Sequence, residues 1–186
     1  MISRRDFTSV EQKLDGRTLA GYSVVYGAES RDIFERGRQF REKIMPGAFD
    51  ASIASGQDVK LLYNHDPRNL LARTKSNTLA LRSDSSGLHF SASLPETTLG
   101  NDVHTLLTRG DLTGEMSFGF HVTDESWDTS KTQRTIKAAK LMEISIVQDA
   151  AYPQTASSLR SVSEASLDLA SLRIALHFRR MQQWTT

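Results

Sequence analysis

The sequence predicts a mainly β protein with a few peripheral helices, of the β-barrel or α+β kind. Short runs in which bulky apolar and small polar residues alternate recur along most of the chain, and this period of two is typical of strands. Turn residues separate the runs at short intervals. A length of 186 residues, with 38% hydrophobic residues, is enough for one domain with a real core.

Glycine and proline divide the first half of the chain into short elements, because glycine tolerates positive φ and proline lacks an amide donor. We expect, in order, a strand over residues 20–26, a charged surface loop over 32–43, a short helix ending at 54, a strand over 59–63, and a hairpin with arms at 78–82 and 88–94.

The second half begins with a helix that Asn101 or Asp102 caps and that Gly110 ends. A strand over 115–122, a polar turn over 124–131 and a further β region over 135–147 complete the β-rich part. We therefore predict a folded domain over residues 1–154, a serine-rich linker over 155–163 and an amphipathic C-terminal helix over 164–186.

The strand expected over residues 115–122 carries the first candidate site residue. Met116, Phe118 and Phe120 alternate with Ser117 and Gly119. Strand periodicity directs the three large side chains into the core and Ser117 away from it. Gly119 leaves room for a ligand beside the serine.

Ser117, His65 and Glu143 together have the chemistry of a serine hydrolase. A serine hydroxyl becomes a nucleophile when a base takes its proton, and histidine is suited to this near neutral pH. A carboxylate usually holds the imidazole in the correct tautomer. The three residues are far apart in sequence, so only folding could bring them together.

Each residue also has a structural interpretation, and spacing alone leaves these open. Ser117 is compatible with a small polar strand residue, His65 with a hydrogen-bonded loop residue, and Glu143 with a partner for an arginine or lysine. Two rival functions follow. One is a non-catalytic β-barrel assembly module, and the other is a metal-dependent hydrolase that uses His65, His121 and Glu143.

Composition narrows the classes of function. The 23 basic and 22 acidic residues leave a net charge of +1, without the basic excess of a general nucleic-acid binder. The absence of cysteine excludes disulfides and thiolate chemistry. No run approaches the ~20 apolar residues that span a bilayer. We expect no cofactor, no metal, no nucleic-acid partner and no membrane partner.

Several segments in one order resemble the prohead maturation proteases of tailed bacteriophages, a serine-protease family similar in fold to the herpesvirus assemblins. The resemblance rests on a helix that ends at Gly110 and on residues 21–27, 45–49, 64–66, 87–90, 117–120, 141–147 and 151–153. It implies that Ser117 is the nucleophile and His65 the general base. Assemblins have a second histidine as third member, whereas the matching strand here offers Glu143. His121, four residues from Ser117, is the competing candidate, although ~13 Å of strand separates the two.

The resemblance implies a serine endopeptidase that cleaves scaffold segments or the precursor of the major capsid protein, and then itself. It would act inside the immature capsid, or prohead, in the host bacterial cytoplasm. Backbone N–H groups near Gly119 or around Ala150 and Ala151, or the side chain of Arg73, are candidate oxyanion donors. The helix over 164–186 fits either a docking and self-association element, which would make a homo-oligomer, or a packed terminal helix.

Overall fold

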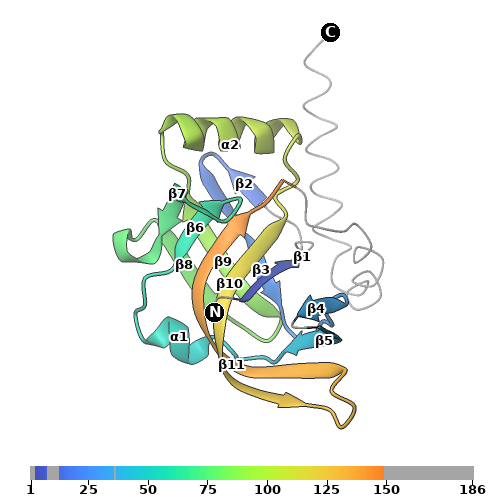
Figure 1. Ribbon diagram of the computed structural model, residues 1–186. Helices are drawn as coiled ribbons and strands as arrows, with labels where there is room; N and C mark the ends of the chain where they lie inside the picture. Colours follow the sequence, from blue (N-terminus) through green and yellow to red (C-terminus); the bar gives the residue numbers. More distant parts are fainter. Residues whose placement is uncertain (1–2, 8–12, 36, 149–186) are drawn as a thin grey trace, which may run out of the picture. The chain divides into compact units, whose positions relative to one another are not determined.

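The computed structural model describes residues 3–7, 13–35 and 37–148 (Figure 1). The linker predicted over 155–163 and the helix predicted over 164–186 lie outside the described residues, as do Ala150 and Ala151. Among the described residues, no helix is long and apolar enough to cross a membrane.

Two β-sheets make up most of the described part of the chain, so the prediction of a mainly β fold is confirmed. The larger sheet contains β1 (Ser3–Phe7), β10 (Met116–Trp127), β11 (Gln133–Ile146), β5 (Arg38–Ile44) and β4 (Ile33–Glu35) in that order, with β6 (Lys60–Tyr63) beside β11 and β7 (Asp66–Arg73) beside β6. The smaller sheet has the order β2 (Lys13–Asp15), β3 (Thr18–Val25), β9 (Gly87–Ser93) and β8 (Leu79–Ser83).

The strand β11 connects the parts of the larger sheet. It runs antiparallel to β10 along its whole length. Its first residues, 133–136, pair in parallel with β5, and its last residues, 143–146, pair in parallel with β6. Figure 1 shows β10 and β11 side by side, with the hairpin that joins them extending past β5. The end of β11 that pairs with β6 carries Glu143 and Ser145.

Helices α1 (Asp50–Ala54) and α2 (Thr98–Arg109) and the 3₁₀ helix η1 (Thr74–Ser76) complete the described elements. Gly110, with φ of 78°, ends α2 as predicted. The predicted cap was wrong, because the Thr97 hydroxyl accepts a hydrogen bond from Gly100 N at 3.2 Å and starts the helix earlier. Asn101 and Asp102 lie inside its first turns.

The prediction of a loop over residues 32–43 was wrong, because this segment contains β4 and most of β5. In β5 the buried positions are Phe40, Glu42 and Ile44, which is strand alternation with a carboxylate at one inward position. Glu42 is only 3% exposed, and the guanidinium groups of Arg5 and Arg134 compensate its charge. The ion pairs come from other strands, so local sequence did not reveal the strand.

The hairpin β10–β11 is longer than predicted. Residues 124–127 continue β10 and pair with β11, so the polar turn is shorter than the predicted 124–131. Asp128 closes it by accepting hydrogen bonds from the backbone N–H groups of Thr132 and Gln133, both at 2.9 Å. The side chains at the end of this hairpin are mostly polar, so the alternation that predicts a strand is absent from its sequence.

One hydrophobic core joins residues of both sheets. Phe49, Phe118 and Phe120 are fully buried in it, and Phe49 meets the other two rings edge-on at centroid distances of 6.0 and 6.1 Å. Aromatic side chains bury large areas, and edge-to-face pairs add about 0.5–1.5 kcal/mol. This packing holds β10, and with it Ser117, in a defined position.

Candidate active site

Ser117 lies on β10 at a point where β1 and β11 flank the strand. Its backbone partners are Asp6 on β1 and Ser145 on β11. Since Met116 and Phe118 point into the core, alternation places Ser117 on the opposite face, as predicted. Ser117 is nevertheless fully buried. Alternation sets the face of a side chain but does not predict what covers it.

His65 is the second residue of a two-residue turn between β6 and β7. Asn64 and His65 have φ of 52° and 58°, the positive region that type I′ hairpins require. A residue other than glycine pays about 1–2 kcal/mol there, so other contacts hold the turn. Asn64 N donates to the carbonyl of Ile146 at 2.9 Å, and Asn64 Oδ1 accepts from Gln148 N at 3.1 Å. These bonds fasten the turn to the end of β11.

Glu143 on β11 is hydrogen-bonded to His65. Glu143 Oε1 lies 2.8 Å from His65 Nδ1, and Glu143 Oε2 accepts a hydrogen bond from Ser145 Oγ at 3.3 Å. The side chains are 17% exposed for His65 and 8% for Glu143. A buried carboxylate needs such partners, and the sequence left open whether histidine or a basic residue would supply one. The structure supplies the histidine.

Gly119 lies directly across the sheet from Glu143. Residues opposite each other on antiparallel strands have side chains on the same face with Cβ atoms about 4.5–5.5 Å apart. The glycine therefore leaves the space beside the carboxylate open on the face that Ser117 and Ser145 share. From the sequence, Gly119 is expected to leave room for a ligand beside Ser117. Its pairing with Glu143 means that it also leaves room beside that carboxylate.

The hydroxyl of Ser117 donates a hydrogen bond to the backbone carbonyl of Arg5 at 2.9 Å. Arg5 belongs to β1, the strand at the edge of the larger sheet. The structure thus brings Ser117, Ser145 and Glu143 to one face of neighbouring strands and brings His65 into contact with Glu143. The hydroxyl proton of Ser117 is directed to the Arg5 carbonyl oxygen of β1.

Two other residues considered from the sequence have different surroundings. His121 pairs across the sheet with Lys140, beyond an irregularity in β10–β11 that follows Gly119. Arg73 lies at the end of β7 away from the turn and forms a bidentate ion pair with Asp58, so its guanidinium is engaged there. Within residues 3–7, 13–35 and 37–148, no three His, Cys, Asp or Glu side chains are grouped to hold a metal ion.

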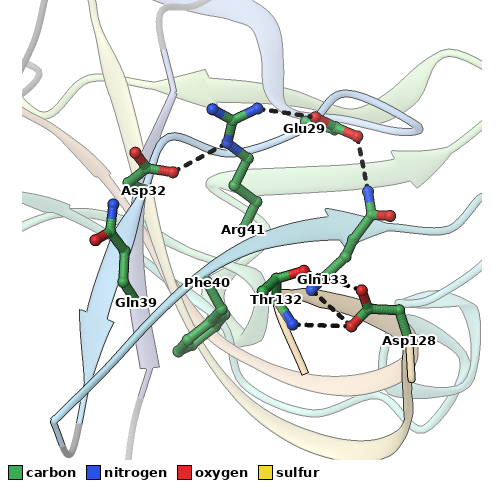
Figure 2. A pocket seen from close by; sticks show the side chains of 8 residues that line it. All are labelled: Glu29, Asp32, Gln39, Phe40, Arg41, Asp128, Thr132 and Gln133. Atoms are coloured by element: carbon green, nitrogen blue, oxygen red, sulfur yellow. Dashed lines mark hydrogen bonds and ion pairs between the residues drawn. The ribbon is translucent and has the colours of Figure 1, made fainter. Parts of the chain in front are cut away.

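A separate depression of about 490 Å³ lies where β5 passes the turn of the β10–β11 hairpin (Figure 2). Arg41 stands between Glu29 and Asp32 in it, with Nε 3.0 Å from Asp32 Oδ1. Gln133 donates to Glu29 at 2.7 Å. The polar groups that line the depression therefore pair with one another. None of the three candidate catalytic residues lines it.

Two contributors to the site were missed by sequence reasoning. Ser145 donates to Glu143, and its position two residues beyond Glu143 on a strand was a signal that it shares the same face. Arg5 contributes a backbone carbonyl, which has no sequence signal. Its position beside Ser117 depends on the pairing of β1 with β10.

A buried serine on a strand and a histidine oriented by a carboxylate are the side chains that serine proteases use. The family model of caudovirus prohead serine proteases matches residues 5–168. The chain therefore belongs to this family and is a serine protease of phage capsid maturation. The match favours an enzyme over the non-catalytic assembly module.

The solved structure of the capsid assembly protease gp21 of bacteriophage T4 resembles this fold. The TM-score is 0.52 at 11% sequence identity, over 80% of this chain and 97% of that chain. At this identity the likeness concerns the fold. No curated protein matches the sequence.

Proposed function

We propose that Ser117, His65 and Glu143 are the catalytic residues of this capsid-maturation protease. The contact of 2.8 Å between His65 Nδ1 and Glu143 Oε1 carries the proposal. It assigns the proton of the imidazole to Nδ1, where the carboxylate accepts it, and leaves Nε2 as the base. Of the two candidates for the third role, Glu143 makes this contact.

In this mechanism Ser117 Oγ attacks the carbonyl carbon of the scissile peptide bond while His65 Nε2 takes the hydroxyl proton. The resulting imidazolium is stabilised by the Glu143 carboxylate, which stays ionised. His65 then gives the proton to the leaving amine, and the acyl-enzyme is hydrolysed by the same steps with water as nucleophile. Backbone N–H groups near Gly119 are our candidates for oxyanion donors.

Capsid proteins of the prohead are the substrates of such a protease. We propose that the cleaved segments are scaffold segments or the precursor part of the major capsid protein, followed by self-cleavage. The prohead is the place of action, and we propose that this prohead lies in the host cytoplasm. We retain homo-oligomer formation, and the absence of nucleic-acid and membrane partners, as parts of this proposal.

Replacement of Ser117 by alanine tests the assignment. We expect Ser117→Ala to fold and to lose cleavage of a capsid-protein precursor by about 10⁶-fold, because the serine, histidine and acid act as a unit. Ser91→Ala is a matched control, because Ser91 is a half-buried strand serine of the smaller sheet. Unchanged cleavage by Ser117→Ala would exclude Ser117 as the nucleophile.

A chelator and a serine-directed acylating reagent separate this mechanism from the metal-dependent rival. We expect cleavage to persist in the chelator and to be lost with the acylating reagent, which should modify Ser117. Loss of cleavage in the chelator, with recovery on adding a divalent metal, would support the hydrolase that uses His65, His121 and Glu143.

A further inference from the structure

The edge of the larger sheet next to Ser117 is occupied by the N-terminal strand of the same chain. In β1, Asp6 lies opposite Ser117 and Arg5 opposite Phe118, in an antiparallel pairing that spans residues 3–7. The strand has β10 as its only neighbour within the described part of the sheet. The edge of a sheet is where an extended polypeptide adds through backbone hydrogen bonds. In this structure β1 is that added strand.

The hydrogen bond from Ser117 to β1 is incompatible with attack. A hydroxyl has one proton, and here that proton is donated to the Arg5 carbonyl oxygen at 2.9 Å. A nucleophilic serine must instead direct its proton to the base and its oxygen to a carbonyl carbon. Ser117 is also fully buried. The arrangement is that of a blocked nucleophile.

The side chain of Arg5 anchors β1 in this position. Its Nε lies 3.0 Å from Glu42 Oε1 and its Nη2 3.2 Å from Glu42 Oε2, and its guanidinium lies over the Phe120 ring at 5.9 Å. Glu42 belongs to β5 and is also paired with Arg134. Loss of the Arg5 side chain would therefore weaken the hold on β1 without leaving Glu42 uncompensated.

We propose that β1 is a built-in blocking strand. It occupies the edge of β10 that an extended stretch of the polypeptide substrate takes during cleavage, and it holds the Ser117 hydroxyl away from the base. The protease becomes active when β1 leaves, and the ion pair between Arg5 and Glu42 sets how readily it leaves. The inference rests on the proposed role of Ser117.

The rate at which a small fluorophosphonate labels Ser117 in the full-length protein tests the inference, because labelling needs an accessible, activated serine but no protein substrate. We expect Arg5→Ala to be labelled about tenfold to a hundredfold faster than the wild type, the range that corresponds to losing a hydrogen-bonded charged partner. Arg5→Lys keeps the charge without the bidentate fork and should lie in between. Hydrolysis of a short peptide should rise in parallel.

Arg41→Ala is the matched control, since Arg41 forms exposed ion pairs with Glu29 and Asp32, and it should be labelled at the wild-type rate. A synthetic peptide with the sequence of residues 1–10 should slow the labelling of Arg5→Ala. Circular dichroism and thermal unfolding establish that each variant is folded. If Arg5→Ala does not fold, Arg5→Lys decides.

The inference is overturned if a folded Arg5 variant is labelled at the wild-type rate or more slowly, with Ser117→Ala unlabelled. In that case the protease assignment stands, and β1 is simply a strand of the active fold. Failure of the reagent to label any variant at Ser117, together with unchanged cleavage by Ser117→Ala, would instead overturn the role of Ser117 and this inference with it.

Discussion

Replacement of Glu143 by glutamine removes the charge behind His65 while keeping the shape of the side chain. In the wild type, Oε1 faces His65 Nδ1 at 2.8 Å and Oε2 accepts from Ser145 Oγ at 3.3 Å. A hydroxyl both donates and accepts, so Ser145 satisfies either orientation of the new amide. We therefore expect both orientations to be populated in Glu143→Gln.

The two orientations give different losses of activity. With the amide oxygen toward His65, the tautomer is kept, and the lost term is a charge-assisted hydrogen bond worth about 1.5–3 kcal/mol, or roughly 10- to 150-fold in rate. With the amide nitrogen toward His65, the proton moves to Nε2 and the base is lost. The corresponding change of an aspartate to asparagine in a Ser-His-Asp protease costs about 10⁴-fold in kcat. Since the productive orientation sets the rate when both are populated, we expect kcat/KM to fall by about 10- to 10³-fold.

The assay is kcat/KM for a fluorogenic peptide, measured in both the wild-type and the Arg5→Ala background so that release of β1 does not limit the rate. Glu125→Gln is the control, because Glu125 on β10 is a partly exposed partner of Arg134. Ser145→Ala removes a longer hydrogen bond and should cost less than about tenfold. A folded Glu143→Gln protein with kcat/KM within about threefold of wild type would refute Glu143 as the orienting residue.

Two further predictions concern stability. Gly87→Ala should lower the free energy of unfolding by about 1–3 kcal/mol, since a Cβ there would lie 2.0 Å from the Val24 carbonyl oxygen. Chemical denaturation measures this loss. Gly16→Ala is the comparison that isolates the cost of backbone conformation, because a Cβ at Gly16 meets no atom within 4 Å while its φ is 56°. Equal losses in the two variants would contradict the steric argument. Asp128 has a pKa lowered to about 2, mainly by the Ser130 hydroxyl and the backbone N–H of Gln133. Because its folded pKa lies below the unfolded value, its contribution to stability is present above about pH 4 and is lost as pH falls toward 2. The wild type should therefore lose more of its melting temperature between pH 6 and pH 2.5 than Asp128→Asn, and parallel losses would disprove this.

Local sequence was sufficient for the strand that carries Ser117. Met116, Phe118 and Phe120 alternate with small residues, and all three are buried in the core. A period of two is a property of the backbone itself, so the pattern predicted the strand and the face of Ser117 without knowledge of its neighbours. The end of α2 at Gly110 was also predictable from local sequence, because glycine readily adopts the positive φ that ends the helix there.

Long-range pairing determined the remaining features. His65 and Glu143 are 78 residues apart, and Ser117 and Arg5 are 112 apart. Their contacts depend on the parallel register of β6 with β11 and on the pairing of β1 with β10. Residues 32–43 were charged enough to predict a loop, but Arg5 and Arg134 from other strands allow Glu42 to be buried in β5.

The amino-acid sequence by itself determined which residues have the chemistry of a protease, since a nucleophile, a base and a carboxylate are properties of side chains. It also determined the strand face of Ser117. Only the tertiary structure decided which acid contacts His65 and which atom receives the proton of Ser117. The physical reason is that a hydrogen bond requires two groups within about 3 Å in the correct orientation, and the register of neighbouring strands sets that geometry.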